Sequence, residues 1–258
     1  MALNFYKYQG TGNDFIVIDN RLQIFSKNNT NYIAKLCDRR FGIGADGLLL
    51  LENHETADFK MVYYNADGKE GTMCGNGGRC ITAFAKQLGI INKSAVFEAV
   101  DGLHESILEG EIVKLKMQNV THIQNHETYQ FLNTGSPHHV QLTQDIENSN
   151  VLKKGAEIRY NKTYNEKGVN VNFVEKVSET VFKVRTYERG VEAETLSCGT
   201  GVTAVALAMH FIKQTRSNKI KLVTPGGNLM VSFKTKNNEY HDIWLQGNAT
   251  LVFKGKIT

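Results

Sequence analysis

The chain has 258 residues, of which 41% are hydrophobic and 22% charged, enough to bury the core of one large domain or two small ones. The formal net charge is +4, and the lysines and arginines are spread along the chain. This argues against nucleic acid as a partner, because nucleic-acid-binding proteins concentrate their positive charge. No apolar run approaches the ~20 residues of a membrane span, and the first residues lack a secretory signal. We therefore expect a cytoplasmic protein with no membrane partner.

Segments of alternating hydrophobicity predict strands throughout the chain. In chain order these strands are Phe15–Ile18, Leu48–Leu51, Phe59–Tyr64, Ile112–Met117, Gly168–Glu175, Val181–Tyr187, Ile220–Val223, Leu229–Phe233 and Ile243–Leu245. Three segments instead predict helices: Tyr32–Arg39, Gly78–Leu88 and Val202–Ile212. The last two are rich in alanine and threonine, so each is slim enough to lie inside a ring of strands.

These two slim helices share a context that suggests an internal duplication. Each follows a strand that ends in tyrosine and then a Cys-Gly-x-Gly sequence, at Cys74–Gly77 and at Cys198–Gly201. We therefore predict an α/β (α+β) fold of two pseudosymmetric domains, each a curved, mostly antiparallel sheet or barrel around a central helix. The expected domains are 1–122 and 123–248, divided at a polar stretch that follows a strand at Lys114–Val120. The C-terminal strand, 249–258, is expected to return to the first domain.

A cysteine directly before a helix has chemical consequences. Free N–H groups and the helix dipole at a helix N-terminus favour an anion, and they bias an adjacent cysteine toward thiolate. Glycines let a ligand approach the backbone. The alternative is that both cysteines are small core residues, but two copies at matching places favour chemistry.

The four cysteines, at positions 37, 74, 80 and 198, are too scattered for a disulfide framework. A zinc site is disfavoured, since the spacing of Cys74 and Cys80 exceeds that of a zinc knuckle and Ala204 occupies the matching place in the second copy. Cys37 and Cys80 are predicted to be structural. The pair His138-His139 would point to opposite sides of an extended segment, so we expect no metal.

Two thiols can invert a carbon stereocentre, because a thiolate can remove a proton from one face while a thiol delivers one to the other. A redox dithiol would use the same residues. The thiols by themselves leave both alternatives open.

Three strings of residues resemble the diaminopimelate epimerase family. They are Thr11–Phe15, then Asn65–Gly68 leading to Met73–Cys80, and Glu188–Gly190 leading to Glu194–Gly201. The resemblance runs from Phe5 to the C-terminal strand. It implies the interconversion of LL- and meso-2,6-diaminopimelate, without pyridoxal phosphate or metal, in lysine and peptidoglycan precursor biosynthesis. It also implies a homodimer, with Phe253 where some members have a tyrosine at the dimer contact.

The resemblance also implies roles for individual residues. Cys74 and Cys198 would be the acid–base pair, and His138 in Gly135-Ser136-Pro137-His138 would support one thiol. Glu188 would also belong to the catalytic set. The reacting carboxylate would be held by Gly75, Asn76, Gly199 and Thr200. The rest of the substrate would be bound by Asn13, Asn65, Asn170, Glu188 and Arg189. Arginine can grip a carboxylate with two hydrogen bonds, and Glu188 can accept from an ammonium.

The sequence departs from the family pattern at three places. Ser136 replaces an asparagine, Gly47 stands where some members have a substrate-facing glutamine, and one extra residue lies between Gly190 and Glu194. These departures concern individual contacts. A proline-racemase-like enzyme is an alternative, as is a redox dithiol or small-molecule binding protein, whereas an isomerase of the phenazine-biosynthesis type lacks the cysteine pair.

Overall fold

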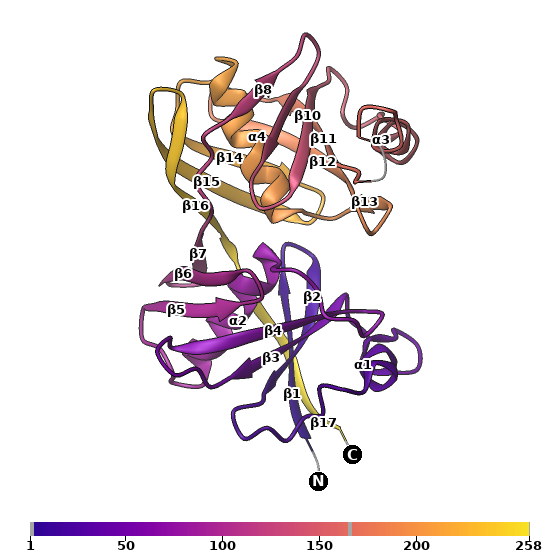
Figure 1. Cartoon of the computed structure of the whole chain (residues 1–258), viewed down its shortest axis with the longest axis vertical. Helices are drawn as coiled ribbons and strands as arrows, with labels where there is room; N and C mark the ends of the chain where they lie inside the picture. The colour runs from indigo at the N-terminus through magenta and orange to yellow at the C-terminus, as the bar shows by residue number, and fades with distance from the viewer. Residues whose placement is uncertain (1–2, 165–166, 258) are drawn as a thin grey trace. The chain divides into compact units, whose positions relative to one another are not determined.

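The computed structural model describes residues 3–164 and 167–257, and the chain divides into two compact units (Figure 1). Unit 1 is Met1–Leu115 with Gly247–Thr258, and unit 2 is Lys116–Gln246. The division thus lies between Leu115 and Lys116, ahead of the polar stretch at which the sequence placed it. The predicted end of the strand Lys114–Val120 is wrong. Strand β7 (Ile112–Lys116) stops at Lys116, and Val120 makes only an isolated bridge to Tyr240.

Unit 1 contains one continuous sheet. Its further strands are β1 (Leu3–Gly10), β2 (Asn13–Asp19), β3 (Gly47–Glu52), β4 (Phe59–Asn65), β5 (Ser94–Ala99), β6 (Gly102–Glu109) and β17 (Thr250–Ile257). The strand order is β17-β1-β2-β3-β4-β5-β6-β7. The last strand of the chain therefore pairs with the first, antiparallel, with Leu3 opposite Ile257.

Unit 2 contains a second sheet. Its strands are β8 (Ile123–Asn125), β9 (Gln130–Asn133), β10 (Pro137–Leu142), β11 (Asn170–Lys176), β12 (Val181–Glu188), β13 (Ala193–Thr195), β14 (Lys219–Thr224), β15 (Gly227–Lys236) and β16 (Glu239–Asn248). The order is β8-β9-β10-β11-β12-β14-β15-β16, and β13 pairs with the end of β12.

The two sheets repeat one succession of pairings. We follow the neighbouring strands from β17 to β7 in unit 1 and from β8 to β16 in unit 2. In both units the successive strand pairs are antiparallel, antiparallel, parallel, antiparallel, parallel, antiparallel and antiparallel. Each parallel connection carries a helix, as parallel pairing requires a crossover. The helices are α1 (Thr30–Cys37) and α2 (Gly75–Gln87) in unit 1, and α3 (Val151–Arg159) and α4 (Gly199–Phe211) in unit 2. This confirms the predicted fold of two pseudosymmetric halves.

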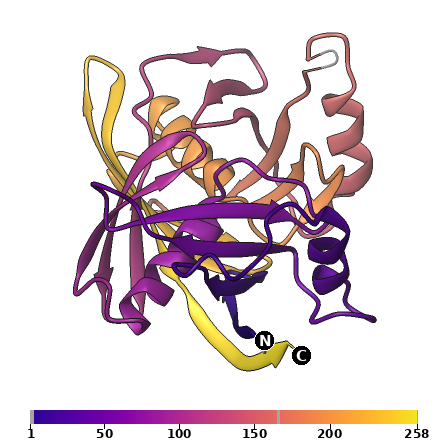
Figure 2. The same ribbon diagram turned by 60° about the horizontal axis from the view of Figure 1, so that its bottom comes forward.

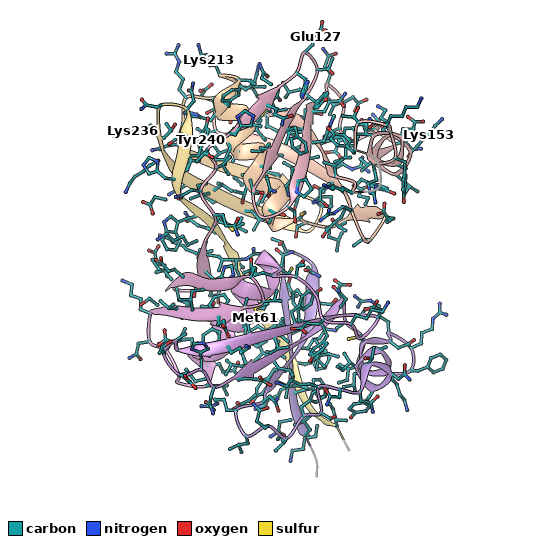
Figure 3. The ribbon with its side chains drawn as sticks, in the orientation of Figure 1. Met61, Glu127, Lys153, Lys213, Lys236 and Tyr240 are labelled. Carbon is teal, nitrogen blue, oxygen red and sulfur yellow. The ribbon has the colours of Figure 1, made fainter. Side chains whose placement is uncertain are left out.

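The second helix of each unit is central. Helix α2 contacts β1, β2, β3, β4 and β6, and α4 contacts β9–β12, β14 and β15. Figure 2 shows the ribbon from a second side. The core of unit 2 is built on α4, whose residues Val202 and Ala204–Met209 are fully buried. In Figure 3 Lys153, Lys213 and Lys236 point outward from unit 2, whereas Met61 lies within unit 1.

Several predicted bounds need correction. Helices α2 and α4 begin at Gly75 and Gly199, about one turn before the predicted starts at Gly78 and Val202. Helix α1 spans Thr30–Cys37 instead of Tyr32–Arg39, because Asn29 caps it by accepting from the Tyr32 amide. Strand β11 begins at Asn170 instead of Gly168, which has a φ of 61°.

Candidate active site

Cys74 and Cys198 occupy the same local position in their units. Each is the extended residue directly before a central helix, with φ/ψ of −111°/121° for Cys74 and −122°/115° for Cys198. Neither cysteine caps its helix with its side chain, and neither first turn contains an acidic residue. The positive end of each helix dipole is therefore not neutralised by its own first turn, which favours an anion at both places.

The glycines of the first turns allow the helices to pack closely. A Cβ atom at Gly77 would come 3.2 Å from Met61, and one at Gly78 would come 2.7 Å from Met73. At Gly201 the added atom would lie 2.5 Å from Asn172 Oδ1. The Cys-Gly-x-Gly sequence thus serves packing as well as access to the backbone.

Asn13 joins Cys74 to the first turn of α2. Its Oδ1 atom lies 3.6 Å from Cys74 Sγ and accepts a hydrogen bond of 3.2 Å from Asn76 Nδ2. Its Nδ2 atom donates to Asp46 Oδ2 at 2.8 Å. A donor on one side and an acceptor on the other fix the orientation of the Asn13 amide. The structure thus brings together Cys74, Asn13 and Asn76.

Arg79 belongs to this group, and the sequence reasoning did not single it out. Its guanidinium is completely buried and donates to Asn76 Oδ1 at 3.0 Å, to Thr11 Oγ1 at 3.2 Å and to the Gly75 carbonyl at 3.4 Å. All three acceptors are neutral, and burial lowers the pKa of the guanidinium. The signal that could have found it is its place on α2, three residues after Asn76 on the same helical face.

His138 lies at the start of β10, directly beside Asn170 at the start of the parallel strand β11. The imidazole is completely buried, and its Nδ1 atom lies 3.1 Å from Asn172 Nδ2. Burial, with the positive charge of Arg189, lowers the pKa of His138 to about 3. It is therefore neutral at pH 7. Its neighbour His139 contacts Tyr164 Oη and Gln141 instead.

Asn170, Glu188 and Arg189 meet at one edge of unit 2. Asn170 Oδ1 accepts from the Arg189 backbone amide at 2.9 Å, and its Nδ2 donates to the Pro137 carbonyl at 3.2 Å. Thr195 Oγ1 donates to Glu188 Oε2 at 2.9 Å. The exposed Arg189 side chain donates through Nη1 to the Lys167 carbonyl at 2.9 Å. In this structure Asn170 thus orients the chain at Arg189.

Thr200, in the first turn of α4, is half-buried, and its Oγ1 lies 3.5 Å from Cys198 Sγ. Its carbonyl accepts from Thr134 Oγ1 at 2.9 Å. The Thr200 hydroxyl therefore lies beside Cys198, whereas the group beside Cys74 is the side-chain amide of Asn13.

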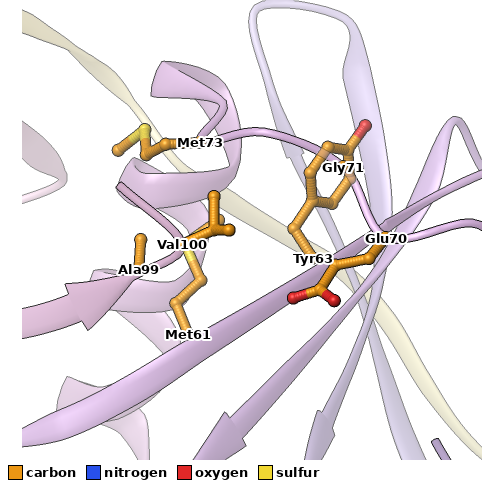
Figure 4. A pocket seen from close by; sticks show the side chains of 7 residues that line it. All are labelled: Met61, Tyr63, Glu70, Gly71, Met73, Ala99 and Val100. Atoms are coloured by element: carbon orange, nitrogen blue, oxygen red, sulfur yellow. The ribbon is translucent and has the colours of Figure 1, made fainter. Parts of the chain in front are cut away.

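Gly47 pairs with the exposed Asn65 across β3 and β4. A Cβ atom at Gly47 would come 2.6 Å from the Tyr63 ring and 2.5 Å from the Tyr64 carbonyl. A longer side chain therefore has no room there. Figure 4 shows Tyr63 in a small hollow with Glu70, Gly71 and Met73, the last two on the segment that leads to Cys74.

The other two cysteines are core residues. Burial raises the pKa of Cys37 to about 11 and that of Cys80 to about 12. Within residues 3–164 and 167–257, histidine, cysteine and acidic side chains form no cluster of three that could hold a metal ion. No helix of that same part of the chain is long and apolar enough to cross a bilayer.

Solved structures share this fold at low sequence identity. A phenazine biosynthesis protein of the PhzF family from Bacillus anthracis superposes with a TM-score of 0.76 at 13% identity, over 100% of this chain and 99% of that one. A hydroxyproline epimerase from Agrobacterium vitis gives 0.69 at 14% identity, over 99% and 92%. At these identities the two structures show that the chain shares their fold.

The family follows from sequence. A model of the diaminopimelate epimerase family matches residues 5–123 and 130–252. A diaminopimelate epimerase of Flavobacterium psychrophilum is 57% identical over 99% of this chain and 100% of its own length. One from Chlorobaculum tepidum is 43% identical over 96% and 99%. The chain belongs to the diaminopimelate epimerase family.

Proposed function

We propose that the protein interconverts LL- and meso-2,6-diaminopimelate, with Cys74 and Cys198 as its acid–base pair. The observation that carries the proposal is the repeated cysteine at the start of a buried central helix in two units of the same topology. The fold needs neither thiol as a cap. Each lies where a helix N-terminus favours the thiolate.

In this mechanism one thiolate removes the α-proton of the substrate, and the other thiol protonates the opposite face of the same carbon. The two cysteines exchange roles in the reverse direction. The backbone N–H groups of Gly75, Asn76, Gly199 and Thr200 bind the carboxylate on the reacting carbon. That interaction stabilises the negative charge that develops when the proton leaves. No step of this mechanism uses a cofactor.

The other end of the substrate is an ammonium and a carboxylate, and we assign it to Arg189 and Glu188 with Asn65. Arg189 is exposed and directly follows Glu188 in the chain, and a zwitterion carries one group that can pair with each of these two charges. Asn13 donates a hydrogen bond to Asp46, and Asn170 donates one to the Pro137 carbonyl, so each has only part of its amide left for the substrate. They therefore both orient their neighbours and line the site.

Exchange of the substrate α-proton tests the proposal. The wild-type protein in deuterium oxide is expected to incorporate deuterium into diaminopimelate, while Cys74→Ala and Cys198→Ala abolish epimerisation. Cys80→Ala is the matched control, since this thiol lies on the same helix but is fully buried. Comparable turnover of proline would favour a proline racemase. Loss of exchange in the wild type, with disulfide reduction retained, would favour a redox dithiol.

We also propose that the protein is a cytoplasmic homodimer formed through β17. Among the strands that the structure describes, β17 pairs only with β1, so its outer edge is open. Leu251, Val252 and Phe253 on it are 39%, 55% and 46% exposed. An open apolar edge tends to be covered by another chain. Light scattering should show a dimer, and Phe253→Asp should dissociate it. The control variant Leu22→Asp, which changes an exposed residue outside β17, should leave the dimer intact.

A further inference from the structure

Three buried residues of unit 2 form a polar network that the sequence did not reveal. Asn172 on β11 contacts His138 on β10 and Thr186 on β12, and all three are nearly inaccessible to solvent. Asn172 Oδ1 also lies where a side chain at Gly201 would be, three residues after Cys198. The network therefore lies directly beneath the first turn of α4.

The surroundings fix the orientation of the Asn172 amide. Its Nδ2 atom lies 3.1 Å from the His139 carbonyl and 3.4 Å from the Asn170 carbonyl. Its Oδ1 accepts from Thr186 Oγ1 at 3.0 Å. A rotation of the amide by 180° would direct Oδ1 at two carbonyl oxygens, so Nδ2 is the atom that faces His138.

This orientation decides where the proton of His138 resides. Asn172 Nδ2 only donates and carries two hydrogens, and its two shorter contacts, each 3.1 Å, are the His139 carbonyl and His138 Nδ1. His138 Nδ1 is therefore an acceptor. A neutral imidazole carries one proton, which must then be on Nε2. In the part of the chain that the structure describes, that buried Nε2 atom has no hydrogen-bond partner.

Unit 1 shows that the fold itself does not need this network. Leu49 faces Gly77 as Asn172 faces Gly201. Phe15 pairs with Gly47 as His138 pairs with Asn170. Both Leu49 and Phe15 are apolar and fully buried. Because burying polar groups costs free energy unless they are fully hydrogen-bonded, the network indicates a role other than packing.

We propose that Asn172 is a positioning residue that fixes His138 as the tautomer protonated on Nε2, so that this imidazole offers a hydrogen-bond donor to the active site. In the resting enzyme His138 is then neither a cation nor a base that accepts through Nε2. It stabilises a negatively charged group, a thiolate or a substrate carboxylate, by donating to it. Only this last step rests on the proposed function.

Nitrogen-15 NMR of the histidine rings tests the assignment in the free protein, without activity. The chain has eight histidines, and His138→Gln identifies the resonances of His138. At pH 7 the wild type is expected to show a neutral ring protonated on Nε2. A proton on Nδ1, or a cationic ring, would overturn the proposal.

Two variants of Asn172 and one control extend the test. Asn172→Leu introduces the residue of unit 1, and Asn172→Asp keeps the size but removes the donor. Both should release the Nδ1 position, give a mixed or Nδ1-protonated ring, and lower kcat at least tenfold. Thr186→Val removes only the contact to Oδ1, so the tautomer should persist.

An unchanged tautomer in both Asn172 variants would overturn the role of Asn172, even if the enzyme epimerises diaminopimelate. Should the variants fail to fold, the wild-type and Thr186→Val spectra still decide the tautomer. Absence of diaminopimelate epimerisation in the wild type would instead refute the proposed function and leave the tautomer assignment intact.

Discussion

Arg79 donates a hydrogen bond of 3.0 Å to Asn76 Oδ1 and thereby determines which end of the Asn76 amide faces Asn13. The chain of contacts continues to Cys74 Sγ. A buried arginine whose acceptors are all neutral contributes little to stability, because it loses its hydration without gaining an ion pair. Its orientation of Asn76 is therefore its more important effect.

We predict that Arg79→Met lowers kcat/KM by about tenfold to a hundredfold. A lost hydrogen bond of roughly 1–3 kcal/mol would free the Asn76 amide to rotate, and each 1.4 kcal/mol corresponds to about tenfold. Steady-state kinetics would measure this. Thr82→Val is the control, since Thr82 is buried on the same helix but bonds to Gly78 and Ser106. Equal losses in both variants would mean that packing of α2 is responsible.

The buried histidines should make the protein sensitive to acid. Burial lowers the pKa of His138 to about 3 and of His139 to about 4, whereas both are near 6.5 in the unfolded chain. Between these values the unfolded state binds more protons. The free energy of unfolding should therefore fall by about 1.4 kcal/mol per pH unit for each histidine as the pH drops below about 6.5.

Urea unfolding at pH 7.5, 6 and 5 would measure this effect, and His139→Gln should reduce the dependence by about one proton. Above pH 7 the variant and the wild type should have parallel profiles. An identical slope in both proteins at acid pH would show that His139 does not remain neutral in the fold.

The ring of Tyr63 should be energetically coupled to Gly71. A Cβ atom at Gly71 would lie 2.6 Å from the ring. Gly71→Ala alone should then cost roughly 1–3 kcal/mol through overpacking. In the background of Tyr63→Val the same change should cost much less. A double-mutant cycle of unfolding free energies would measure the coupling, and simple additivity would show that the segment shifts freely.

The four thiols should differ in reactivity. Thiolate is the reactive form, and burial raises the pKa of Cys37 to about 11 and of Cys80 to about 12. Iodoacetamide at pH 8 should therefore alkylate the half-buried Cys74 first and leave both core cysteines unmodified until urea is added. Peptide mass spectrometry would follow each site. Modification of Cys80 as fast as Cys74 would contradict the packing of α2.

The sequence predicted the parts of the fold that have a local signal. Two alanine-rich helices after repeated cysteines were predictable, but their first turns were not, because glycines have low helix propensity. Helix α3 was missed because it lacks an apolar stripe. Its buried residues are Val151, Gly155 and Arg159. The pairing of His138 with Asn170 depends on a parallel register between strands separated by that helix. The contact between His138 and Asn172 therefore could not be predicted from the sequence.

The place of β17 in the fold has a consequence for synthesis of the protein. Unit 2 is one uninterrupted stretch, Lys116–Gln246, whereas unit 1 needs Gly247–Thr258 to complete its sheet. Chains emerge from the ribosome N-terminus first, so one edge of β1 stays open until β17 has been synthesised. All of unit 2 is therefore synthesised before the last strand of unit 1. An open strand edge is prone to wrong pairing, so synthesis that stops between unit 2 and β17 would leave unit 1 in an aggregation-prone state.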